Sequence, residues 1–398
     1  MTQYSAPNFD VNLDPEGFVI DLDSLYAALA RLKDSRHARG VRYSLVNLLV
    51  CIVLAKLAGE DYLAGIAEWV AKRTKPLSEM LHWVKPRAAH RTTYSRILGH
   101  VIDITEFEQV VHDFFANPAH AGESILINLD GKTLRGTIPA GKTRGVHLLA
   151  AYLPGEGWVL AQIEVGAKEN EIPASVRMLK CLDLQGKIIT GDALLAQREL
   201  SRQIVEADGD YVWTLKENQP QMIEDLETLF AGETVVKGFS PATHDFRPAE
   251  TIEKGHGRIE RRALTASTEL KGYGNWPYAE QVFKLERHFE RVADGHVMHE
   301  VVYGVTSLTA QKADAARLLE LVRSHWAIEN RLHYRRDQTM REDWYHVRMG
   351  TAPQAMAVIN NLVLGLLDKQ DFRSVPEARR HYAANLDQAL DLIIQPPC

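Results

Sequence analysis

The stretch ILINLDGKTLRGT, residues 125 to 137, places an aspartate at the end of a run typical of a buried strand. Asp130 followed by Gly131 is a strong signal for a hairpin turn between two strands. A carboxylate at the end of a buried strand is also well placed to hold a metal ion. Taken alone, the stretch leaves both interpretations of Asp130 open.

Two further carboxylates occupy comparable positions. The segment GKIITGDAL, residues 186 to 194, predicts a short buried strand that ends at Asp192. The segment 313–337, ADAARLLELVRSHWAIENRLHYRRD, predicts a long amphipathic helix, on which His325, Glu329 and His333 share one face. For Glu329 the alternative is a structural role, because buried acids are usually paired with a base.

Three carboxylates in one place would repel one another unless a cation lay between them. Two like charges about 4 Å apart repel by about 4 kcal/mol at an effective dielectric constant of about 20. A set of oxygen ligands without sulfur favours Mg²⁺ or Mn²⁺. Two such ions about 4 Å apart can activate a water or a DNA 3′-hydroxyl for in-line attack on phosphorus. We therefore expect two Mg²⁺ ions, with Mn²⁺ as a substitute, on Asp130, Asp192 and Glu329.

Two other kinds of site fit the sequence less well. His325 and His333 lie two helical turns apart, about 12 Å, so both could not bind one tetrahedral zinc ion. The segment GKTRG, residues 141 to 145, is only a fragment of a phosphate-binding loop, and no complete glycine-rich loop follows a predicted strand.

The predicted elements indicate a mixed α/β protein. Residues 20 to about 110 predict helices, and from about 123 three strands precede alternating helices and strands. This order predicts a mixed sheet covered by helices, and by analogy a ribonuclease-H-like core. In that fold the strands ending at Asp130 and Asp192 are parallel neighbours. The expected divisions are an N-terminal helical, DNA-binding domain (1–115), the first part of the core (116–230), a mostly β insertion before the glutamate helix (231–300), and the second part of the core with C-terminal helices (301–398).

Composition is that of an ordinary globular protein, and the chain is long enough for two or three compact units. The net charge of −6 argues mildly against nucleic acid, but three segments are locally basic: 31–42, 85–96 and 254–262. Each is either a solvated surface or part of a surface that faces phosphate. Three widely spaced cysteines indicate a reduced, cytoplasmic protein, and no apolar run is long enough to cross a membrane.

Five motifs together resemble the H-repeat-associated branch of the insertion-sequence DDE transposases. They are INLDGKTLRG, IITGDALLAQ, LKENQ, KGHGRIERR and RSHWAIENRLHYRRD with REDWYHVR. The resemblance implies a ribonuclease-H-like core, binding of terminal inverted repeats, metal-dependent DNA cleavage, and strand transfer into target DNA. It implies Asp130, Asp192 and Glu329 as the catalytic triad, with spacings of 192 − 130 = 62 and 329 − 192 = 137 residues.

The resemblance also implies double-stranded DNA as partner, a homodimer on paired transposon ends, and a place in the bacterial cytoplasm with the nucleoid. The expected DNA contacts are Lys132, Arg135, Lys216, Asn218, His256, Arg258, Arg323, His325, Arg335 and Arg336. Two alternatives stay open: a nuclease or resolvase that cleaves without strand transfer, and a domesticated DNA-binding protein without activity.

The chain departs from the family around Glu329. Related transposases carry Tyr, Arg and Lys at seven and four residues before and seven after the glutamate, where this chain has Val322, His325 and Arg336. We hypothesise that His325 takes the role of the arginine, which would make activity more dependent on pH. Asp337 is the substitute for Glu329 if that residue is not the third acid.

Overall fold

The computed structural model describes residues 21, 23–115, 125–231, 245–255, 257–272 and 276–395. Within them, nine strands form one sheet in the order β3-β2-β1-β4-β5-β9-β8-β7-β6. The predicted mixed α/β class is confirmed. The strands are β1 (Leu126–Thr133), β2 (His147–Leu153), β3 (Trp158–Val165), β4 (Ile188–Gly191), β5 (Asp210–Leu215), β6 (Arg247–Gly255), β7 (Arg258–Ser267), β8 (Gln281–Arg291) and β9 (Val297–Thr306).

The first five strands have the order and directions of a ribonuclease-H-like core. β1 is antiparallel to β2 and parallel to β4, and β4 is parallel to β5. Leu129 lies opposite Gly191 in the register of β1 and β4. Because Asp130 and Asp192 directly follow these two residues, they stand at the same level, Asp130 within β1 and Asp192 just after β4. β1 continues through Gly131 to Thr133, so Asp130 is not the last residue of its strand, and Asp130 and Gly131 do not form a hairpin turn.

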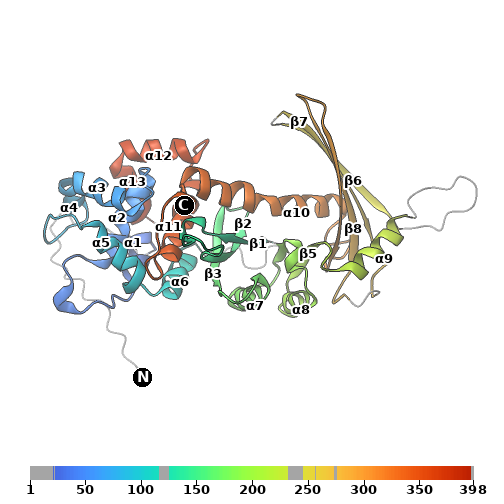
Figure 1. The fold of residues 1–398 in the computed structure, drawn as a ribbon, viewed down its shortest axis with the longest axis horizontal. Helices are drawn as coiled ribbons and strands as arrows, with labels where there is room; N and C mark the ends of the chain where they lie inside the picture. The colour runs from blue at the N-terminus through green and yellow to red at the C-terminus, as the bar shows by residue number, and fades with distance from the viewer. Residues whose placement is uncertain are drawn as a thin grey trace, which may run out of the picture.

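The segment predicted as a β insertion continues this same sheet. Its last strand, β9, pairs antiparallel with β5, as Val305 lies opposite Trp213. β8, β7 and β6 follow as long antiparallel strands, which Figure 1 shows as a tall ribbon far from the N-terminal helices. The return of the chain from the insertion to the main sheet, expected near residue 300, occurs at β9.

Helices cover both faces of the sheet. α10 (Ala315–Ala327) crosses one face in contact with β1, β4 and β5. α7 (Glu171–Cys181) and α8 (Arg198–Glu206) lie on the opposite face, and α9 (Pro220–Ala231) follows β5 (Figure 1). α7 begins as predicted, since the Asn170 side chain accepts a hydrogen bond from the backbone N–H of Ile172.

The N-terminal helices pack against the C-terminal ones. α2 (Leu45–Leu57) is apolar on almost every side and is therefore buried on every side. It contacts α11 (Ala352–Asp368), which in turn packs on β3 and so joins the helical region to the sheet. The remaining helices here are α1 (Leu25–Ala30), α3 (Leu63–Lys72), α4 (Thr74–Met80), α5 (Arg91–Arg96), α6 (Ile104–Phe115), α12 (Val375–Ala384) and α13 (Leu386–Ile394). Across the described part of the chain, none of the helices combines the length and apolar character needed to cross a bilayer.

Candidate active site on strand β1

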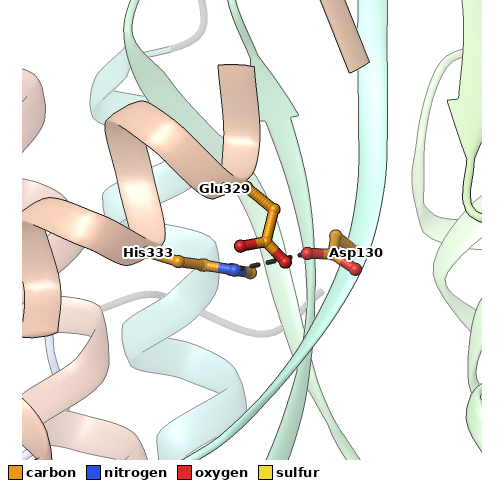
Figure 2. Close-up of side chains that lie close together, drawn as sticks. All are labelled: Asp130, Glu329 and His333. Carbon is orange, nitrogen blue, oxygen red and sulfur yellow. Dashed lines mark ion pairs between the residues drawn. The ribbon is translucent and has the colours of Figure 1, made fainter. Parts of the chain in front are cut away.

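Asp130, Glu329 and His333 converge at the middle of the molecule. One ligand atom from each lies within 4.8 Å of the others. Figure 2 shows the three side chains turned toward one another, Asp130 from β1 and the other two from the helical segment after α10. Asp130 is largely buried, His333 is buried and Glu329 is exposed, so the group opens to solvent at the glutamate.

The helical segment that carries Glu329 is not a regular α-helix. The α-helix ends at Ala327, and residues Ile328–His333 and Arg335–Thr339 are π-helical. A continuous helix over 313–337 was expected, and the wider π turns are the difference. Such π segments occur frequently at functional sites. The segment packs on β1, and it brings Glu329 and His333 to the strand that carries Asp130.

Asp192 lies next to this group but is not one of its three members. Its side chain accepts a hydrogen bond from the backbone N–H of Leu195 and so caps a short 3₁₀ turn after β4. Burial raises the pKa of Asp192, and the negative charges of Glu171 and Asp130 raise it further. A carboxylate with a raised pKa beside two other acids is typical of a site that receives a cation.

Glu171 is a fourth acid at the site, and it was not among the residues predicted from the sequence. It lies in the first turn of α7, and its Oε1 is 2.8 Å from Nε2 of His147. A Cβ atom added at Gly131 would clash with the Glu171 carboxylate, so the glycine after Asp130 allows this close approach. In the sequence, only the glycine after Asp130 signals this close approach, and a glycine there fits a turn equally well.

Lys132 and Arg335, two of the predicted DNA contacts, are mostly buried in internal ion pairs, whereas Arg258 and Arg323 also pair with acids but keep about half of their side chains exposed. Lys132 is buried, and its Nζ donates to Asp337 Oδ1 at 2.6 Å. Asp337, the substitute for Glu329, therefore neutralises a lysine and is not part of the group around Asp130. Arg335 donates to the Asp368 carboxylate at 2.5 Å.

Arg336 requires a correction. Its side chain is fully buried, and its Nη2 lies 2.9 Å from the Glu342 carboxylate. A guanidinium that is buried and paired in this way cannot contact a DNA phosphate. Burial would raise the pKa of Glu342, but the charges of Arg336 and Lys132 outweigh it and lower that pKa.

His325 faces the same end of the sheet, where its Nδ1 is 3.2 Å from the Thr190 hydroxyl. Burial lowers the pKa of His325 below its ordinary value, and the negative charge of Asp130 only partly opposes this. Burial therefore disfavours the protonated imidazole, which counts against His325 as a permanent positive charge in place of the arginine.

The other predicted contacts lie around the site. Lys216 and Asn218 line a hollow of about 640 Å³ together with Asp192, and the Asn218 amide donates to the Ala193 carbonyl at 2.7 Å. Arg135 has 80% of its side chain exposed. His256 lies outside the described residues.

A groove of about 1030 Å³ runs between α10 and strands β6, β7 and β8, and its lining includes Asn330 and Arg331, which follow Glu329 in the chain. It contains Arg258 and Arg323, two of the predicted contacts, and four further cations. Arg287, missed in the sequence, lies with its guanidinium 5.0 Å from the ring centre of Trp326, which is 51% exposed. The charged residues lining the groove are Lys254, Arg258, Arg262, Arg287, Arg323 and Arg331, against Glu253, Glu260 and Glu320.

Comparison with known protein families agrees with this geometry. Residues 121–366 match the family model described as Transposase DDE domain, and residues 26–115 match the model described as DDE_Tnp_1-associated. The chain belongs to the DDE transposase family. The first of these matches spans β1 to α11, and therefore includes the whole candidate site.

Relatives of this transposase carry matching names. YncI of Escherichia coli O157:H7, named as a transposase, is 27% identical over 92% of this chain and 93% of its own length. YhhI of Escherichia coli K12, named as an H repeat-associated transposase, is 25% identical over 93% of this chain and 97% of its own length. The H-repeat-associated branch is therefore confirmed. Among solved structures, the piggyBac transposase synaptic complex with hairpin DNA aligns with a TM-score of 0.41 and 11% identity, over 94% of this chain and 80% of that one.

Proposed function

We propose that this DDE transposase binds the terminal inverted repeats of its element, cleaves DNA there and joins the ends to target DNA. In this proposal Asp130, Asp192 and Glu329 are the catalytic carboxylates. The observation that carries it is the convergence of Asp130 and Glu329, which are 199 residues apart (329 − 130), with Asp192 on the neighbouring strand.

The donor set fits divalent cations. Asp130 Oδ2 is buried without a hydrogen bond to any described residue, and three acids lie close to it. Bound Mg²⁺ or Mn²⁺ would activate the attacking hydroxyl and stabilise the leaving oxygen. The protein's own part is to hold Asp130 and Asp192 at one level on adjacent strands, and to bring Glu329 to them from the π-helical segment.

The basic groove between α10 and strands β6, β7 and β8 is the proposed path of the DNA backbone. It carries six cations against three acids, so its net charge is opposite to that of the whole chain. Phosphate contacts by Lys and Arg supply most of the sequence-independent part of DNA affinity. Arg258 pairs with Glu260 and Arg323 with Glu253, but 50% and 48% of their side chains stay exposed and can face a phosphate.

Residues 1–115 are the proposed second DNA contact, and two of the three basic segments lie together there. The Tyr43 hydroxyl, just after the first segment, donates to the Ala88 carbonyl in the second at 3.2 Å. Arg42 and Lys85, one from each segment, line one pocket of about 290 Å³. Two separate DNA surfaces fit a homodimer that holds paired transposon ends.

The test uses DNA that carries both natural flanks of the gene. Purified protein and Mg²⁺ are added with a second plasmid as target, and breaks and joined products are mapped. Wild type and Asp183→Asn, an exposed acid between α7 and β4 and the matched control, should cut at the flanking repeats and join the ends. Asp130→Asn, Asp192→Asn and Glu329→Gln should bind the DNA but leave it uncut.

Two results would contradict the proposal in different ways. Cleavage at the repeats without joined products would identify a nuclease that uses the same acids. Binding without cleavage by the wild type would identify a DNA-binding protein that has lost catalysis.

A further inference from the structure

His333 is a buried histidine beside the two carboxylates Asp130 and Glu329. It lies four residues after Glu329, and only 7% of the residue is exposed. Its Nδ1 is 3.2 Å from Asp130 Oδ2. Among the described residues, neither Asp130 Oδ2 nor His333 Nε2 has a hydrogen-bond partner. Buried polar atoms are normally satisfied, and groups left without a partner point to a ligand, ion or water.

The positions of these atoms suit a cation. The ligand atoms of His333, Asp130 and Glu329 all lie within 4.8 Å of one another, close enough for one ion to contact all three. Figure 2 shows the imidazole nitrogen turned toward both carboxylates. Nitrogen lone pairs bind first-row transition metals better than they bind Mg²⁺, which prefers oxygen alone.

We propose that His333 is a direct metal ligand, and that its nitrogen makes the site formed with Asp130 and Glu329 prefer Mn²⁺ to Mg²⁺. The inference rests on the proposed function for the metal site itself. It adds a residue outside the carboxylate triad and a preference that oxygen ligands alone would not give.

A different role for His333 would leave the geometry unchanged. The imidazole could act only as a positioning residue that pairs with Asp130 and keeps the carboxylate oriented. The two roles differ in whether the nitrogen contacts the ion, which magnetic resonance measures directly.

The experiment uses the full chain without DNA. Mn²⁺ binding is followed by the electron paramagnetic resonance signal of the free ion, and Mg²⁺ binding is measured by competition. Pulsed measurements of the bound Mn²⁺ then detect nitrogen coupling, with natural-abundance and ¹⁵N-histidine protein compared. This second measurement needs no variant, so it does not depend on whether a variant folds.

The variants are His333→Gln and, as the matched control, His112→Gln. His112 is a partly buried histidine on α6, outside the site, and its Nδ1 is 2.7 Å from the Leu160 carbonyl oxygen. We expect nitrogen coupling in wild type and His112→Gln, and none in His333→Gln. The Mn²⁺ Kd of His333→Gln should rise at least about tenfold, since even residues that only orient a ligand are worth roughly 10- to 100-fold. The Mg²⁺ Kd should rise less, so that the preference falls.

Two results would overturn the inference. Bound Mn²⁺ without nitrogen coupling in the wild type would show that His333 is not a ligand. If His333→Gln lost Mn²⁺ and Mg²⁺ affinity equally and its bound Mn²⁺ still showed nitrogen coupling, His333 would be a positioning residue. Failure of the proposed metal site gives a different result from failure of the inference on His333. In that case Asp130→Asn would bind both ions as tightly as the wild type does.

Discussion

Lys132 Nζ donates to Asp337 Oδ1 at 2.6 Å, and this ion pair joins β1 to the helical segment that carries Glu329. Lys132 is two residues after Asp130 and so points to the same face of the strand. Asp337 lies eight residues after Glu329 in the following π-helical turns. The pair therefore fixes the two elements that bring Asp130 and Glu329 together.

Removal of this lysine should destabilise the protein. Lys132→Met leaves Asp337 without its partner in a mostly buried environment, and we expect the free energy of unfolding to fall by about 2 kcal/mol. Urea denaturation measures the loss. In the double variant Lys132→Met/Asp337→Asn the two losses should not add, because both remove the same pair. Additive losses would show that the pair does not couple the two elements.

Substitution of Arg336 should lower stability, whereas substitution of Arg135 should weaken DNA binding. Arg336→Met strands the buried Glu342 carboxylate, and the expected loss in unfolding free energy is about 3 kcal/mol or more. Arg135→Ala removes a side chain that is 80% exposed and should change stability by less than about 0.5 kcal/mol while weakening DNA binding. Guanidinium denaturation and filter binding on both variants give the comparison. An Arg336→Met protein as stable as wild type would contradict the structural role of the buried pair.

The sequence predicted the parts of the site that depend on local pattern. The buried strand that carries Asp130, the strand that ends just before Asp192, and the helix face with Glu329 and His333 follow from apolar periodicity and spacing. The continuation of β1 past Asp130 to Thr133 was not predicted, because the Asp-Gly pair favoured a turn there. Their meeting was inferred from a fold-level analogy and the family motifs. The pairing of Lys132 with Asp337 could not be inferred in this way, because it joins positions 205 residues apart.

Arg336 shows a second limit. A basic residue in a charged motif fits a phosphate contact as well as it fits a buried ion pair, and only the tertiary structure distinguishes the two. Its partner Glu342 lies beyond the helix, after a turn at Arg341 in which the backbone φ is 51°. The extension of the sheet by β6, β7 and β8 is likewise a long-range pairing, since no local pattern states which edge a strand will join.

Glu108 should make stability depend on pH. Burial raises the pKa of this α6 residue to about 8, and the charge of Glu164 contributes in the same direction. Between the ordinary value of 4.5 and about 8 the folded protein holds a proton that the unfolded chain releases, so stability should fall as pH rises through this window. The slope is at most about 1.4 kcal/mol per pH unit for one group. Melting temperatures of wild type and Glu108→Gln from pH 5 to 9 test this, and parallel curves would contradict it.

Charge removal in the groove should change the salt dependence of DNA binding. If Arg258 contacts a phosphate, Arg258→Gln should lower the slope of log K against log salt concentration by about 0.9, the value for one released counterion on duplex DNA. Arg323→Gln should have the same effect. Lys180→Gln is the matched control, because Lys180 is an exposed cation on α7, across the sheet from the groove. Fluorescence anisotropy over a range of salt concentrations measures all four proteins. A slope that falls as much in Lys180→Gln as in Arg258→Gln would mean that total charge, not the groove, attracts the DNA.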